Sequence, residues 1–190
     1  MLVINSIKYL SQRDPRWGKV KMGNSQVDIA HYGCLITCIA MVSQFFGEEI
    51  TPEEIAKQKG WFNSLGSFIW INSDFSNMSF RWREGSESPM SGKSPIDMDL
   101  IKSYLASGKN LPSDNNRAVI LQVANESHWV LGLWEQNGDI LAIDPWTGKT
   151  CEVLKEYKNI TGAALFVRWN KNEHDLPAWR AKKPEAPDYF

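Results

Sequence analysis

A nearly continuous apolar stretch at residues 34–46 limits what this chain can fold into more than any other feature of its sequence. Apolar side chains fall on almost every side of a helix drawn over this stretch, so it predicts a buried helix. Gly47 follows directly and predicts the end of that helix. A buried helix needs other elements around it, and a 190-residue chain that is 43% apolar and 12% aromatic can supply them within one domain.

Strand-like segments dominate the second half of the chain. They are residues 118–123, 127–134, 140–143, 152–154 and 163–169. Asn137-Gly138 separates the second segment from the third, and this dipeptide is a strong signal for a tight hairpin, so these two strands are expected to pair antiparallel. The order of elements predicts an α+β fold in which N-terminal helices, with the central helix that carries Cys34, pack on a C-terminal antiparallel sheet.

Two shorter helices and an aromatic segment complete the predicted organisation. Residues 51–54 form a capping-box pattern with proline at the first helical position, and they predict a helix that runs to about Lys59. Another helix is expected to begin at residues 94–97 and to continue through Leu105. The aromatic residues of segment 61–92 either form a wall of a substrate groove or cover the core, and the core is the more common place for them.

Cys34 opens the apolar helix, which is a suitable position for a nucleophile. A thiol attacks as the thiolate, and the N-terminus of a helix favours negative charge. The free N–H groups of the first turn point to where an oxyanion would form, and Gly33 lets the backbone come close to a substrate carbonyl. The alternative is that Cys34 is a small core residue, which is the more common role of a single free cysteine.

The predicted hairpin brings His128, at the start of one strand, near Asp144, at the end of its partner. The carboxylate would fix the tautomer and orientation of the imidazole. The imidazole would then take the proton of the Cys34 thiol and return it to the leaving group. A helix-opening cysteine together with such a histidine–aspartate pair predicts a thiol hydrolase.

Four segments in this order resemble a known family. They are YLSQRDPRWG at residues 9–18, YGCLITCIAMV at 32–42, HWV at 128–130 and IDPWTG at 143–148. They are similar to the bacteriocin-leader (double-glycine) peptidase-like cysteine peptidases, family thirty-nine of the cysteine peptidases, which have a papain-like fold. The resemblance implies a papain-like domain at residues 1–169, followed by an extended C-terminal tail at 170–190.

The resemblance also implies roles for particular residues. Cys34 is the expected nucleophile, His128 the general base and acid, and Asp144 the residue that orients the histidine. An upstream glutamine is expected to support the oxyanion hole. Gln12 matches that motif by its neighbours, whereas Gln26 lies closer to the cysteine in sequence but lacks the flanking pattern.

Three residues beside these are expected to contact substrate. They are Gly33, Trp129 and Trp146. The expected function is cleavage of a peptide or amide bond through an acyl-enzyme, with a peptide or peptidoglycan stem as substrate, as in a bacterial or bacteriophage cell-wall hydrolase. Acyl transfer would use the same residues. The competing interpretation is a catalytically silent papain-like module of a larger assembly. Leu35 follows the cysteine where the family commonly has Gly-Pro, and neither Gln12 nor Gln26 matches the family's glutamine in both neighbours and spacing.

Composition narrows the expected partners, cofactors and location. A net charge of −1 with scattered basic residues argues against nucleic acid or an anionic membrane as partner. No segment has the length of a membrane span or of a signal peptide, and an odd count of three cysteines fits a reducing compartment, so we expect a soluble, cytoplasmic or virion-associated protein. No cofactor or metal is expected, since Cys34 and Cys38 lack further ligands at zinc spacing. The aromatic residues of the C-terminal tail indicate packing on this chain or on a protein partner.

Overall fold

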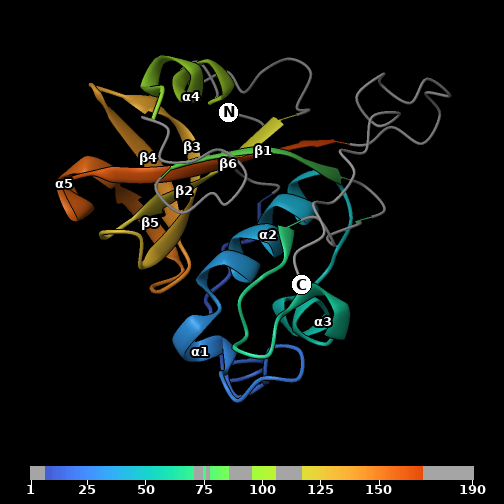
Figure 1. The fold of residues 1–190 in the computed structure, drawn as a ribbon. Coiled ribbons are helices and arrows are strands. Elements are labelled where there is room, and N and C mark those ends of the chain that lie inside the picture. Colours follow the sequence, from blue (N-terminus) through green and yellow to red (C-terminus); the bar gives the residue numbers. More distant parts are fainter. Residues whose placement is uncertain (1–6, 71–74, 76–77, 86–95, 106–116, 169–190) are drawn as a thin grey trace, which may run out of the picture.

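The computed structural model describes residues 7–70, 75, 78–85, 96–105 and 117–168, which form helices on both faces of one antiparallel sheet (Figure 1). The strands are β1 (Met78–Gly85), β2 (Arg117–Val123), β3 (His128–Gln136), β4 (Asp139–Asp144), β5 (Lys149–Glu152) and β6 (Ile160–Arg168), in the order β1-β6-β2-β3-β4-β5. The helices are α1 (Ile29–Tyr32), α2 (Cys34–Phe45), α3 (Pro52–Ala56), α4 (Met98–Tyr104) and α5 (Val153–Tyr157). This architecture confirms the predicted α+β fold, with the Cys34-bearing helix packed on the C-terminal sheet.

The apolar stretch at residues 34–46 forms α2, as predicted. Nine of its residues are buried, which fits a helix that is apolar almost all round. Phe46 caps the C-terminus, and Gly47 then takes a positive φ of 93°, a conformation that suits glycine. α2 packs mainly on β3, with further contacts to α3 and β2. This packing holds the helix against the middle of the sheet.

Two hydrophobic cores cover the two faces of the sheet. The first joins α2 and α3 to inward residues such as Ile120 and Phe166. The second joins α4 and α5 to the opposite face, through residues such as Leu121 and Leu165. Because both faces are covered, β2 is buried from Ala118 onward, and its buried residues are apolar except Gln122 instead of alternating with polar ones.

The hairpin predicted at Asn137-Gly138 is present. Both residues have a positive φ, 53° and 82°, as a tight two-residue turn between twisted strands requires. β3 and β4 pair antiparallel, with Leu131 opposite Ile143 and Gln136 opposite Asp139.

The prediction of a strand at residues 152–154 is correct for Glu152 and wrong for the two residues that follow. Glu152 ends β5, and the chain then turns into α5. The carboxylate of Asp139, in the hairpin, accepts hydrogen bonds from the backbone N–H groups of Leu154 at 2.7 Å and Lys155 at 3.0 Å. A side chain distant in sequence therefore caps this helix, and the local pattern of 152–154 contains no sign of it.

Replacing Asp139 by alanine is expected to lower the free energy of unfolding by about 1–2 kcal/mol, because it removes the cap of α5. Urea unfolding at pH 7 measures the change. The matched control is Glu156→Ala, which removes an exposed carboxylate from α5 itself and is expected to change stability by less than about 0.5 kcal/mol. Equal losses in the two variants would contradict a capping role for Asp139.

The other two predicted helices begin or end at different residues. The capping box at Thr51 and Glu54 is present, but α3 ends at Ala56 and not near Lys59. The Ala56 carbonyl there accepts a hydrogen bond from Gly23 N–H, and a short 3₁₀ turn, Lys59–Trp61, follows. Within the described residues, α4 begins at Met98, later than predicted, and ends one residue before Leu105.

The aromatic segment belongs to the core where it is described. Phe62 and Phe75 are buried, and Trp61, Phe68 and Trp70 pack against the same core. The segment also contains β1, which the sequence did not predict. The predicted tail at 170–190 lies outside the described residues. None of the helices in the described part of the chain has the length and hydropathy needed to cross a membrane.

Candidate active site

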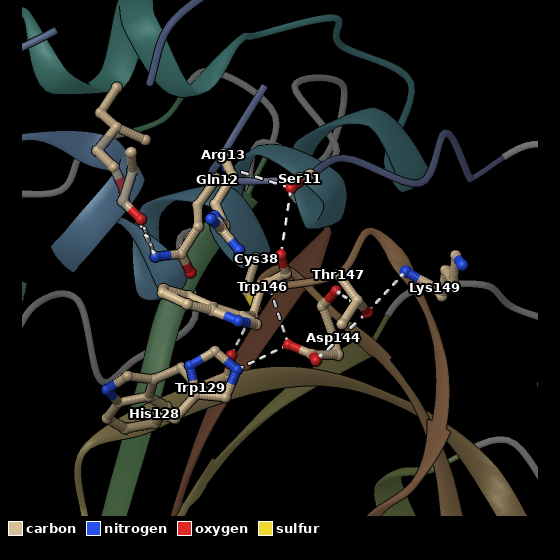
Figure 2. A network of polar contacts seen from close by, with 12 residues as sticks. Ser11, Gln12, Arg13, Cys38, His128, Trp129, Asp144, Trp146, Thr147 and Lys149 are labelled. Carbon is tan, nitrogen blue, oxygen red and sulfur yellow. Dashed lines mark hydrogen bonds and ion pairs between the residues drawn. The ribbon is translucent and has the colours of Figure 1, made fainter. Parts of the chain in front are cut away.

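The β3–β4 hairpin brings His128 and Asp144 into direct contact. His128 begins β3 and Asp144 ends β4, and their side chains meet with Nε2 and Oδ1 2.7 Å apart (Figure 2). Both side chains are largely buried. The two-residue turn pairs the strands antiparallel, and a register shift between Gly132 and Trp134 of β3 then sets which residues share a face at the strand ends.

Asp144 is held as an acceptor by several donors. Its Oδ1 accepts the backbone N–H of Trp146 at 2.8 Å, and its Oδ2 accepts the hydroxyl of Thr147 at 3.3 Å. Burial acts to raise the pKa of Asp144, but the hydrogen bond with His128 and the other donors outweigh it and hold the pKa below its usual range. Asp144 is therefore an ionised carboxylate at neutral pH.

His128 lies between Asp144 and Cys34. Burial acts to lower the pKa of His128, but its hydrogen bonds with Asp144 and with Cys34 outweigh burial and raise the pKa to about 9. Because Nε2 contacts Asp144, Nδ1 is the ring nitrogen left for the thiol. The ring thus connects a carboxylate to a sulfur atom and favours an imidazolium between them.

This raised pKa links stability to pH. His128 has a folded-state pKa of about 9 against an ordinary value of 6.5, so the folded protein binds this proton more tightly. Its contribution is complete below pH 6.5 and is lost as the pH rises through 9. We expect the free energy of unfolding to fall by on the order of 2–3 kcal/mol between pH 6 and pH 9.5, as measured by urea unfolding. His128→Gln should lack this loss, and parallel pH dependences would contradict the assignment.

Cys34 is the first residue of α2 and is buried. Gly33 precedes it as the N-cap and contributes no side-chain cap, so the first N–H groups of α2 are not used by a capping side chain. Gly33 is also required for packing: a Cβ there would lie 2.6 Å from the carbonyl oxygen of Ile29. The glycine therefore permits the close succession of α1 and α2, which the sequence prediction had linked to substrate approach alone.

Gln12 connects the two parts of the site. Its side chain is 1% exposed and Nε2 donates to the Ala30 carbonyl of α1 at 3.0 Å, while its backbone N–H donates to the Pro145 carbonyl at 2.8 Å (Figure 2). Gln26 is exposed, and its backbone carbonyl accepts a hydrogen bond from Lys21. Of the two candidate glutamines, Gln12 is the one that the structure joins to the loop next to Asp144.

The two tryptophans predicted to contact substrate differ in their surroundings. Trp129 is buried, packs on Trp70 with ring centroids 5.6 Å apart, and accepts a 3.5 Å hydrogen bond from the Cys38 thiol at its carbonyl. Trp146 is partly exposed, and the guanidinium of Arg13 lies 4.7 Å from the centre of its ring. Figure 2 shows the two side chains on either side of the His128 ring.

Tyr157 belongs to the site and was missed by the sequence analysis. It ends α5, its ring centroid lies 5.7 Å from that of His128, and its hydroxyl hydrogen-bonds to Asp144. Burial raises the pKa of Tyr157, and the charge of Asp144 raises it further, so the phenol stays protonated and donates. No local pattern marks this residue, because its position depends on a helix that the sequence did not predict.

The other two cysteines have environments that keep the thiol protonated. Cys38 is fully buried, and burial, followed by the electrostatic interaction with Cys34, raises its pKa well above the ordinary value. Burial and the charge of Asp144 raise the pKa of Cys151 to about 12. All three cysteines are free thiols. Among the residues that the structure describes, no cluster of three or more His, Cys, Asp or Glu side chains could hold a metal ion.

Comparison with known proteins gives one match. The model of the family described as "Peptidase_C39 like family" matches residues 4–175, which confirms the resemblance inferred from the sequence. No curated protein and no solved structure matches the chain. The family match indicates a cysteine peptidase, and the mixed helix-and-sheet architecture agrees with the papain-like fold expected for it.

Proposed function

The chain belongs to the Peptidase_C39 like family, and on that basis we propose that it cleaves a peptide or amide bond with Cys34 as nucleophile, His128 as general base and acid, and Asp144 as the residue that orients His128. The observation that carries this proposal is the chain of contacts from the thiol through the imidazole to the carboxylate. Strongly shifted pKa values cluster at functional sites, and this buried histidine contacts the first residue of a buried helix.

The proposed reaction has two halves. His128 holds the proton from the Cys34 thiol as the sulfur bonds to the carbonyl carbon, and the carbonyl π electrons move to oxygen. The oxyanion returns its electrons as the C–N bond breaks, and the departing nitrogen receives the proton from His128. Water then attacks the thioester with His128 as base, which releases the acid and restores the thiol.

Gln12 is proposed to help bind the oxyanion together with the first N–H groups of α2. Its Nε2 donates to the Ala30 carbonyl at 3.0 Å and makes a longer contact with the Ile29 carbonyl at 3.5 Å. The developing negative charge would take the N–H of the longer contact in place of Ile29. Trp146 and Trp129 are proposed to contact the substrate on the two sides of the reacting bond, with Gly33 allowing its close approach.

The structure bears differently on the substrate and on the silent-module alternative. The site supports attack on an amide carbonyl in general, so a cell-wall stem peptide as the natural substrate, or a protein partner for the C-terminal tail, stays a prediction from the sequence. The silent-module alternative rested in part on Leu35, and that residue lies in the first turn of a regular α2, directly after a cysteine that still contacts His128.

The test is incubation with a mixture of random-sequence peptides, followed by mass spectrometry of the new ends. Cleavage that is absent from Cys34→Ala supports the proposal, and added amines that appear on the new carboxyl ends would identify acyl transfer instead of hydrolysis. Intact peptides in the presence of a folded wild-type protein would contradict the proposal and favour a binding module.

A further inference from the structure

A cavity of about 340 Å³ opens beside the proposed nucleophile, between the helices and the sheet. Cys34 itself lines it, together with Leu35 of α2, the loop at residues 62–68, Gln122 of β2 and Trp129 of β3. Its volume falls within the range of small-ligand sites. A cavity that shares a wall with the nucleophile is placed to hold part of the substrate.

Aromatic rings form a continuous wall of this cavity. Phe62 and Phe68 lie 5.7 Å apart between ring centroids, Phe68 and Trp70 5.5 Å, and Trp70 and Trp129 5.6 Å. Each ring therefore supports the next, and the hydrophobic core supports all four. A wall of this kind favours the binding of a large apolar group. Because the rings are already held in place, binding costs little side-chain conformational entropy.

Hydrogen bonds within the loop at residues 62–68 hold its shape. The side chain of Asn63 accepts backbone N–H bonds from Leu65 at 3.0 Å and Ser67 at 2.9 Å, and Phe62 and Phe68 close the loop as a bridge. Its tip presents Leu65, 76% exposed, and Tyr32 beside Cys34 is 64% exposed. Both line the cavity, so two of the large apolar side chains that the described surface exposes stand at its mouth.

A buried acceptor lies in the same wall. Gln122 is 2% exposed, and its Nε2 donates to the Glu126 carbonyl at 2.9 Å, which fixes the direction of the amide. Its Oε1 is buried and has no hydrogen-bond partner within the described part of the chain. A buried acceptor without a partner is costly, so a ligand N–H that reached it would be favoured.

The position of the leaving group determines which part of the substrate the cavity holds. His128 must protonate the departing nitrogen, so the leaving group lies toward His128 and Asp144. Trp146 and Arg13 lie on that side and do not line the cavity. The cavity is lined by Cys34 but by neither His128 nor Asp144, so it suits the acyl part of the substrate better than the leaving group.

We propose that this cavity binds a large apolar side chain, aromatic or branched aliphatic, at or next to the residue that supplies the scissile carbonyl, and that Gln122 accepts a hydrogen bond from an N–H of that acyl part. The inference rests on the proposed function for the identity of the reacting bond. Glu126 is the charged residue among those that line the cavity, so acidic side chains are disfavoured there.

The side-chain preference of the cavity can be measured from the sequences of the peptides cleaved in the random-sequence mixture. We expect phenylalanine, tryptophan, leucine and methionine to be enriched about tenfold over glycine, alanine and aspartate in the two residues before the new carboxyl end. Leu65→Ser, at an exposed loop tip, should reduce that enrichment at least threefold without changing the fold. Tyr9→Ser is the matched control, because Tyr9 is 40% exposed and does not line the cavity. Cleavage without enrichment, or with enrichment of glycine, would overturn the inference and leave the proposed function intact.

A binding measurement separates the cavity from catalysis. In the Cys34→Ala protein, N-acetylphenylalanine methylamide should bind about tenfold more tightly than N-acetylalanine methylamide and shift the indole signals of Trp70 and Trp129 in NMR spectra. Its acetoxy analogue, in which oxygen replaces the acetamide N–H, should bind about fivefold more weakly, and Gln122→Met should abolish that difference. Selective binding with no peptide cleavage would support the cavity and contradict the proposed function. Equal binding of the phenylalanine and alanine compounds would overturn the cavity assignment.

Discussion

Replacement of His128 by alanine is expected to slow the reaction of Cys34 with iodoacetamide at pH 7 by about 100-fold. In the proposed site His128, held by Asp144 and in contact with the sulfur, takes the thiol proton, and the resulting imidazolium stabilises the thiolate. Alanine removes both effects while Cys34 keeps its place at the start of α2. Mass spectrometry of the alkylated peptides gives the rate for each cysteine as a function of pH.

Cys38 and Cys151 provide the internal control for this measurement. Burial raises the pKa of both thiols, so both should react slowly and at the same rate in the two proteins. Similar rates for Cys34 in wild type and variant would show that the Cys34–His128 contact does not activate the thiol. That outcome would remove the nucleophile from the proposal.

Replacement of Asp144 by alanine is expected to lower the rate of peptide cleavage by about a thousandfold or more, whereas asparagine at the same position should retain most of the rate. The reason is the double use of Oδ1, which accepts from His128 Nε2 at 2.7 Å and from the backbone N–H of Trp146 at 2.8 Å. In Asp144→Asn the backbone N–H holds the amide oxygen in that place, so it still accepts from Nε2–H. Alanine removes the acceptor altogether, and the ring loses its orientation.

The pH profile distinguishes orientation from charge in these variants. Asp144→Asn keeps the hydrogen bond but removes the negative charge that helps to raise the pKa of His128. The alkaline limb of its cleavage rate should therefore move to lower pH, although its rate at pH 6 stays near that of wild type. An asparagine variant as inactive as the alanine variant would show that the charge, and not the position of Oδ1, is what His128 requires.

Local sequence signals predicted much of the framework that carries the site. The buried helix from Cys34 and the Asn137-Gly138 hairpin each depend on residues close together in the chain, namely an apolar run and a turn dipeptide. The hairpin was enough to predict that His128 and Asp144 lie near each other, whereas the register shift between Gly132 and Trp134, which sets the faces on which they lie, was not predicted. Three of the four segments that carry the family resemblance belong to this helix and hairpin and the residues next to them, and the fourth is residues 9–18.

The misassigned elements share a physical cause. Residues 153–157 are helical because Asp139 caps them from the neighbouring hairpin, and a propensity pattern contains no information about such a cap. β1 was not predicted because it pairs along its length with β6, far away in sequence, within an aromatic segment that also serves the core. In both cases a tertiary contact decided between local conformations of similar free energy.

The sequence by itself determined the chemistry that this protein carries and the two local structures that present it: a cysteine at the start of a buried helix, and a histidine and an aspartate at the ends of a hairpin. Only the tertiary structure decided that Gln12 joins the site while Gln26 stays exposed, that Tyr157 bonds to Asp144, and that helix, loop and sheet enclose a cavity next to Cys34. Turn chemistry and apolar periodicity act between neighbours in the chain, whereas these contacts exist only after distant segments have packed around shared hydrophobic cores.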